Sequence, residues 1–93
     1  MLTLRTTSQY RKDRKRAIKN GLPMHMLDEV LEELAAENPL DPKHNDHALK
    51  GNYTGYRECH IKPDWLLIYT VDKGHLIRKR QIIRRVATTK QNI

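Results

Sequence analysis

The sequence predicts a single small α+β domain over residues 1–93 with the order β-α-α-β-β-β, in which an antiparallel sheet packs against an N-terminal helical hairpin. Three observations support this fold class. Two stretches near the N-terminus lack Gly and Pro except at their boundaries and carry helix-capping residues. The second half has apolar runs separated by turn signals, as antiparallel strands do. The chain has 93 residues, enough for one hydrophobic core and too few for two.

The first two predicted elements are a short strand and a basic helix. Leu2–Leu4 is β-prone. Gln9–Lys19 contains no Gly or Pro; Thr7 and Ser8 before it are good N-cap residues, and Asn20-Gly21 after it is a typical C-terminal signal. The helix is weakly amphipathic, so its Arg and Lys side chains must face solvent or a partner. Its apolar anchors are Tyr10, Ala17 and Ile18.

The second predicted helix has the clearest pattern in the sequence. Pro23 opens it, and Asn38-Pro39 ends it. Its apolar residues recur at steps of three and four, with acidic residues on the other side. The apolar positions are Met24, Leu27, Val30, Leu31, Leu34 and Ala35. Residues 38–52 contain two prolines and no periodicity, so we expect an ordered loop there.

Three strands are predicted in the second half. Tyr53–Ile61 alternates weakly, Trp65–Val71 is an almost continuous apolar run, and a last strand extends from His75 to about Ile83. The segments between them, Lys62-Pro63-Asp64 and Asp72-Lys73-Gly74, are turn signals. Because the middle run is apolar at nearly every position, we expect it at the centre of the sheet.

Charge is distributed unevenly along the chain. The formal net charge is +7, from 18 Lys and Arg against 11 Asp and Glu. Residues 1–20 and 77–93 are strongly basic, whereas residues 21–49 are acidic. The positive excess predicts binding to a polyanion, with an affinity that falls as salt rises. The alternative is a charged surface that only keeps the protein in solution.

Membrane and secreted proteins are disfavoured. The longest apolar run, Trp65–Tyr69, is far shorter than the roughly 20 residues that a transmembrane helix needs. No apolar signal segment follows Met1. The single cysteine, Cys59, cannot form an internal disulfide and has no partner at metal-ligand spacing. We therefore expect a cytoplasmic protein.

Three of the five histidines, His44, His47 and His60, form a cluster in the predicted topology. Histidine titrates near neutrality and suits a general acid or base, for example in RNA cleavage by 2′-hydroxyl attack. Arginine suits the phosphate, because its planar fork pairs with two oxygens. These histidines are otherwise ordinary surface residues of a polar loop. A zinc site is a further alternative, with ligands from His44 and His47 and from Asp46, His60 or Asp64.

Four residues around the second predicted strand allow two interpretations each. Trp65 either packs in the core or, beside Asp64 on a basic surface, stacks on a nucleobase. Tyr56 has the same two options. Arg57 either contacts RNA or forms an ion pair with a nearby acid. Cys59 alternates with the next residue along the strand, so we expect it to point inward and to be buried.

A long and specific motif spans DHALKG at residues 46–51 and GYRECHIKPDWLLIY at residues 55–69. It closely resembles the YafQ-type toxins of the RelE/ParE superfamily of toxin–antitoxin systems, whose element order is the one predicted above. The resemblance is strong over residues 46–71 and fair over residues 1–45. It implies a RelE-like fold and a ribosome-dependent endoribonuclease that cleaves mRNA in the ribosomal A site. It also implies no metal or other cofactor, and an antitoxin partner encoded beside the toxin.

The resemblance implies the site residues as well. The family's catalytic histidines fall on His47 and His60, its acid on Asp64 and its arginine on Arg80, judged by the spacing from Trp65. These groups would serve in acid–base chemistry and phosphate contact, and the sequence does not show which histidine is the base. Further contacts with mRNA and ribosomal RNA are expected from Arg11, Lys12, Lys15, Lys50, Arg57 and Trp65.

The chain departs from the family pattern from about residue 78 onward. Family members end with Arg, then Gly-Thr/Ser-His and Leu-Phe, whereas here no histidine follows His75 and no glycine follows Gly74. The family's terminal histidine would fall near Arg84. Loss of one proton-transfer group typically lowers a rate about 10²- to 10⁴-fold. One alternative is therefore a catalytically impaired module that binds only RNA or antitoxin. A metal-dependent hydrolase is a second, and the gyrase-poisoning branch of the superfamily, which generally lacks this His and Asp set, is a third.

Overall fold

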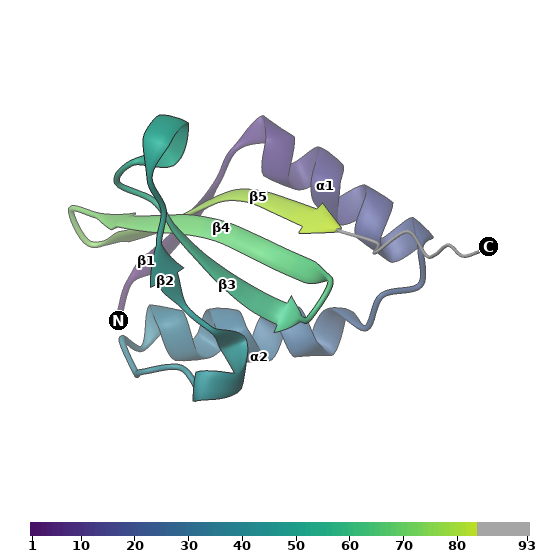
Figure 1. Ribbon diagram of the computed structural model, residues 1–93, viewed down its shortest axis with the longest axis horizontal. Helices are drawn as coiled ribbons and strands as arrows, with labels where there is room; N and C mark the ends of the chain where they lie inside the picture. Colours follow the sequence, from purple (N-terminus) through teal and green to yellow (C-terminus); the bar gives the residue numbers. More distant parts are fainter. Residues whose placement is uncertain (84–93) are drawn as a thin grey trace.

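The computed structural model describes residues 1–83 and shows two helices packed against a five-stranded sheet (Figure 1). The predicted α+β class and element order are confirmed, with one extra short strand before the last three. The tail beyond residue 83, including the expected histidine position near Arg84, lies outside the described residues. The elements are β1 (Thr3–Thr6), α1 (Ser8–Lys19), α2 (Met24–Ala35), η1 (Pro42–His44), β2 (His47–Ala48), η2 (Gly51–Tyr53), β3 (Arg57–Lys62), β4 (Trp65–Asp72) and β5 (His75–Ile83).

The strand order β1-β5-β4-β3-β2 places β4 at the centre, as its continuous apolar run predicts. The pairings of β2 with β3, β3 with β4 and β4 with β5 are antiparallel, whereas β1 pairs with β5 in parallel. The sheet is therefore mixed, not wholly antiparallel as predicted. Parallel neighbours need a long crossover connection, and the chain between β1 and β5 supplies one.

Helix α1 begins where its capping residues predict. The Thr7 Oγ1 atom accepts a hydrogen bond from the Tyr10 amide at 3.0 Å. The helix buries Tyr10, Asp13 and Ala17, which lie on one stripe at helical spacing. Ile18, expected as an apolar anchor, is 48% exposed, because it follows Ala17 directly and so points away from that stripe.

The hydrophobic core lies between the helices and one face of the sheet. Figure 1 shows α1 alongside β5 and α2 nearest β3. From α2, the buried residues are Leu27, Val30, Leu31 and Ala35, as its periodicity predicts. Alternate residues of β3 and β4 complete the core, because successive side chains of a strand point to opposite faces. These are Cys59, Ile61, Trp65, Leu67 and Tyr69. The intervening residues of both strands therefore belong to the face that carries neither helix.

The loop predicted over residues 38–52 is ordered and contains η1, β2 and η2. Strand β2 pairs with β3 and sets His47 opposite Glu58. Two residues are too few to give an alternating pattern, so the sequence does not reveal this strand. Strand β3 begins at Arg57 and not at Tyr53, because Tyr53 ends η2 and Gly55 has a φ of 94°, which an extended strand does not contain.

Within residues 1–83, neither helix is long and apolar enough to cross a membrane.

Candidate active site

A row of paired residues crosses the sheet and carries most of the predicted site. His47 of β2 lies opposite Glu58 of β3. Glu58 lies opposite Ile68 of β4, and Ile68 lies opposite Arg80 of β5. Residues directly opposite one another on neighbouring strands project from the same face. This is the face without helices, and His60, two residues after Glu58, shares it.

The rings of His47 and His60 lie close together on this face. Their centroids are 6.5 Å apart, and their planes are inclined by 38°. Both side chains are half-buried, so each ring is partly held by the protein and partly open to solvent. Two imidazoles at this separation can reach different oxygens of one phosphodiester, as acid–base cleavage requires.

His47 is held at both ring nitrogens. Its Nδ1 atom lies 2.7 Å from the Asn45 carbonyl oxygen, and its Nε2 atom lies 3.4 Å from Glu58 Oε1. Both neighbouring atoms are acceptors, so the doubly protonated imidazolium satisfies both contacts. Glu58 is buried, at 6% exposure, and our sequence reasoning missed it. Glu58 and His60 are two residues apart in the same strand, and this spacing is the signal that places both side chains on one face.

Within the described residues, His60 has a hydrogen bond at one ring nitrogen. Its Nδ1 atom lies 3.2 Å from the Pro63 carbonyl oxygen, which can only accept, so Nδ1 donates. In the neutral ring the Nε2 atom then carries the lone pair and can take a proton. Asp64 follows Pro63 in the turn between β3 and β4 and is half-buried. Within residues 1–83, no hydrogen bond or ion pair joins the Asp64 carboxylate to either histidine.

Arg80 is fixed by an acid from α1. Its Nε atom lies 3.3 Å from Asp13 Oδ2, and its Nη2 atom lies 3.5 Å from Asp13 Oδ1. The Asp13 carboxylate is the main cause that raises the pKa of Arg80, with a smaller contribution from Tyr53 of η2. The Arg80 side chain stays 32% exposed, so part of the guanidinium is accessible to a ligand.

A β-bulge in β5 brings a second cation to the site. Ile68 pairs with Arg80, but Tyr69 pairs with Arg78, so Lys79 has no partner on β4. A bulge changes the direction in which the neighbouring side chains point. The Lys79 ammonium lies 5.5 Å from the centre of the Tyr56 ring, in a cation–π contact. Sequence reasoning missed Lys79, because a bulge leaves no local pattern.

Two of the residues expected to bind RNA are placed otherwise. Trp65 is fully buried, and its Nε1 atom donates a hydrogen bond to Gln81 Oε1 at 2.8 Å, so the prediction that it stacks on a nucleobase is wrong. The physical reason is its position in β4, where it faces the helices. Arg57 pairs across the sheet with Tyr69 and shares its face, and Arg57 Nε donates to Asp46 Oδ1 at 3.3 Å. The remaining four are exposed: Arg11, Lys12 and Lys15 on α1, and Lys50 after β2.

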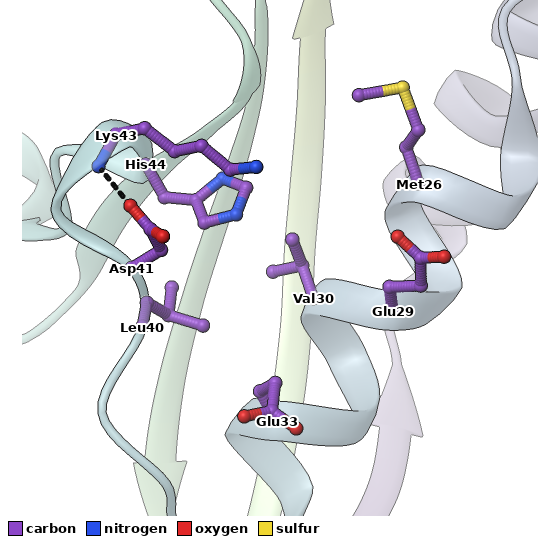
Figure 2. Close-up of a pocket in the computed structure, with 8 residues that line it drawn as sticks. All are labelled: Met26, Glu29, Val30, Glu33, Leu40, Asp41, Lys43 and His44. Carbon is purple, nitrogen blue, oxygen red and sulfur yellow. Dashed lines mark hydrogen bonds between the residues drawn. The ribbon is translucent and has the colours of Figure 1, made fainter.

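His44 contacts the backbone of His60 and is not one of the paired residues of the row. Its Nδ1 atom lies 2.7 Å from the His60 backbone oxygen, while its ring lies in a pocket between η1 and α2. Figure 2 shows His44 and Leu40 on one side of this pocket and Val30 and Glu29 on the other. Residues 1–83 contain no group of three or more His, Cys, Asp or Glu that could hold a metal ion, so the set considered for zinc is not assembled.

Comparison with known proteins points to one family. A family model described as the bacterial toxin of the type II toxin–antitoxin system, YafQ, matches residues 2–88. The mRNA interferase toxin YafQ of Escherichia coli K12 is 41% identical over 64 residues, which cover 68% of this chain and 70% of that protein.

Solved structures agree with this match. A metal-bound toxin from Helicobacter pylori superposes with a TM-score of 0.84 at 44% identity, covering 89% of this chain and 94% of that chain. In the E. coli DinJ–YafQ toxin–antitoxin complex, the similar chain superposes with a TM-score of 0.80 at 34% identity, covering 88% of this chain and 91% of that chain.

Proposed function

The chain belongs to the YafQ family of bacterial type II toxins, and we propose that it is a ribosome-dependent endoribonuclease that cleaves mRNA by metal-independent acid–base catalysis. The observation that carries the proposal is the pair of half-buried imidazoles, His47 and His60, 6.5 Å apart on the helix-free face. Arg80 projects from the same face in the same row of paired residues. The E. coli relative bears the name mRNA interferase.

The hydrogen bonds of the two histidines suggest separate roles. His60 donates through Nδ1 to a carbonyl, so its Nε2 lone pair takes the proton from the ribose 2′-hydroxyl. The 2′ oxygen then bonds to phosphorus, and the bond from phosphorus to the 5′ oxygen breaks. His47 gives the leaving 5′ oxygen its proton. Its Nε2 contact with Glu58, at 3.4 Å, is longer than a good hydrogen bond, so this proton can pass to substrate.

Arg80 and Asp64 complete the proposed chemistry. The free N–H groups of Arg80 bind the phosphate oxygens, whose charge increases in the transition state. Asp64, in the turn beside His60, accepts a hydrogen bond from a substrate hydroxyl. The proposed steps use side chains alone.

The proposed partners follow from charge and family. The exposed Arg11, Lys12 and Lys15 of α1, with Lys50, contact RNA phosphates of the message and of the ribosomal A site. The E. coli relative forms a toxin–antitoxin complex with DinJ. We expect a corresponding antitoxin to bind this chain and to cover the histidine face.

The test is single-turnover cleavage of a reporter mRNA in a translating extract. We expect His47→Ala and His60→Ala each to lower the rate about 10²- to 10⁴-fold, while His25→Ala on the exposed side of α2 does not. The wild-type rate should describe a bell between about pH 5 and 8. A chelator selective for transition metals, which leaves ribosomal magnesium in place, should have no effect.

Two results would overturn the proposal. Cleavage at the same rate by wild type and by both histidine variants would leave a module that only binds RNA or antitoxin. Loss of cleavage with the chelator, restored by added zinc or copper, would establish a metal-dependent hydrolase instead.

A further inference from the structure

Asp13 is a buried acid in an otherwise basic helix. It is 2% exposed, and every neighbouring charged residue of α1 is basic. A carboxylate is buried only at a high cost in free energy unless donors surround it. Its Oδ1 atom accepts from Gln9 Nε2 at 2.9 Å, and its Oδ2 atom accepts from the backbone N–H of Gln81 at 3.0 Å. The remaining donors come from Arg80.

The contacts of Asp13 fix two consecutive residues of β5, Arg80 and Gln81. Strand β1 pairs with β5 only as far as Arg78, so the following part of β5 has no strand on that side. There Asp13 binds the backbone of Gln81 and the guanidinium of Arg80 together. Because the Asp13 carboxylate binds both the Gln81 backbone and the Arg80 guanidinium, the Arg80 side chain loses most of the conformational freedom that an arginine has in solvent.

We propose that Asp13 is the positioning residue for Arg80, and that it holds the guanidinium at the edge of β5, beside the helix-free face, so that its remaining N–H groups meet a phosphate of bound RNA. This inference rests on the function proposed above. The ion pair uses Nε and one hydrogen of Nη2, so Asp13 does not occupy the remaining N–H groups of the guanidinium. Tyr53 of η2 adjoins the same guanidinium. Arg80 is therefore held from α1 and from η2, in the row that contains His47.

A double-mutant cycle tests whether Asp13 acts through Arg80. The Asp13→Asn variant keeps an oxygen that can accept from the backbone N–H of Gln81, but it removes the negative charge that binds the Arg80 guanidinium. We expect Asp13→Asn to lower single-turnover cleavage about 10- to 100-fold, because a catalytic group displaced by about 1 Å loses that much. In the Arg80→Ala background, Asp13→Asn should change the rate by less than about two-fold.

Controls separate positioning from folding. Asp72→Asn makes the same chemical change at the exposed end of β4 and should leave cleavage at the wild-type rate. Gln9→Ala removes one bond to Asp13 from an exposed position, and should lower the rate only a few-fold, again with no effect when Arg80 is absent. If Asp13→Asn and Arg80→Ala lower the rate independently, so that the double variant shows the product of both losses, the inference is wrong.

A second measurement does not depend on cleavage. The ¹⁵N–¹H signal of Arg80 Nε, assigned by its loss in Arg80→Ala, should exchange slowly with water in the wild type and fast in Asp13→Asn. An unchanged signal in a folded Asp13→Asn variant would overturn the inference. If the wild type cleaves no RNA, but its Arg80 Nε signal still exchanges more slowly than that of Asp13→Asn, the proposed function is refuted. The positioning of Arg80 by Asp13 is then still supported.

Discussion

Single residues in this protein take their roles from the side of the sheet on which they lie. Along β4, Trp65 and Leu67 belong to the core beneath the helices, whereas Leu66 and Ile68 alternate with them on the other face. All four are buried, and β4 is central in the sheet, with β5 on one side and β3 on the other. In the motif PDW, the indole therefore lies in the core, whereas Asp64 is half-buried.

Replacement of Trp65 by Phe tests this placement. The variant removes the donor to Gln81 Oε1 and part of the core volume, so we expect the free energy of unfolding to fall by about 1–3 kcal/mol. Affinity for a short RNA oligonucleotide should stay within about two-fold of wild type, since the ring contacts no ligand. Urea unfolding and fluorescence anisotropy measure the two quantities. A large loss of RNA affinity in a stable variant would contradict burial of the indole.

Buried acidic groups of the core predict a loss of stability in alkali. Burial raises the pKa of the Cys59 thiol from 9.0 to about 12 and also raises the pKa of the Tyr69 hydroxyl. Each group keeps its proton longer in the folded chain than in the unfolded chain. The stabilisation is fully present below about pH 9 and is lost as the pH rises toward 12, by at most about 1.4 kcal/mol per pH unit for each group.

Urea midpoints at pH 7, 9 and 10.5 measure this effect. We expect the Cys59→Ala variant to lose less stability between pH 9 and 10.5 than wild type does, although it is less stable at pH 7. Equal slopes for the two proteins would show that the thiol titrates alike in the folded and unfolded chains.

At the scale of elements, β2 is the least supported part of the site and carries His47. Besides its pairing with β3, it is held by Asp46, which accepts from the Tyr69 hydroxyl at 2.6 Å and from Arg57 Nε at 3.3 Å. After β2, the backbone N–H of Leu49 donates to the backbone carbonyl oxygen of Tyr56 at 2.9 Å. Two strand residues alone would not hold the imidazole ring in place, so these flanking bonds set the position of His47.

The Tyr69→Phe variant should loosen this strand selectively. Loss of a hydrogen bond to a charged group costs about 1.5–3 kcal/mol, and that cost falls on the segment that Asp46 anchors. We expect faster amide hydrogen exchange at Leu49 and a lower cleavage rate. Thr70→Val is the matched control, because its hydroxyl bonds to the Gly55 oxygen and not to Asp46. Faster exchange throughout the sheet, with none specific to Leu49, would show that Tyr69 supports the core only.

Most of the fold could be predicted from the sequence because its signals are local. Capping residues, helical periodicity and turn dipeptides act within a few residues, and they located both helices and the last two strands. The parallel pairing of Thr3 with His75 joins residues far apart in the chain, and no local pattern encodes it. Strand β2 has only two residues and depends wholly on β3.

The site could be predicted only in part, for the same reason. His47 and His60 stand out through a specific motif, and alternation along β3 separates His60 from Cys59. The contact of His47 with Glu58 arises from strand register, which the sequence does not give. Asp13 looked like one acid in a solvated basic helix, and its partner Arg80 lies 67 residues further on. Its place on the stripe of Tyr10 and Ala17 is the one local sign of its burial.

At the scale of the whole molecule, the two helices give the protein two electrostatic sides. The exposed residues of α1 are mostly basic, and those of α2 are mostly acidic. Helix α1 lies alongside β5, which contributes Lys79 and Arg80, so the basic helix and the basic strand adjoin (Figure 1). A polyanion is therefore attracted to the side with β5, and the acidic side with α2 repels it.

The salt dependence of RNA binding should locate this basic side. Each phosphate contact with single-stranded RNA adds about 0.7 to the slope of log affinity against log salt, because bound cations are released. Replacing Arg11, Lys12 and Lys15 together by Gln should therefore lower the slope by about 2, and weaken binding most at low salt. The variant with Lys43 and Lys73 replaced by Gln removes exposed charges from η1 and from the β4–β5 turn, and should change the slope by less than about 0.7. Titrations at several salt concentrations, with a catalytically inactive His60→Ala background to keep the RNA intact, measure both slopes. Equal changes per charge in the two variants would mean that RNA responds to net charge alone and that α1 is not its contact surface.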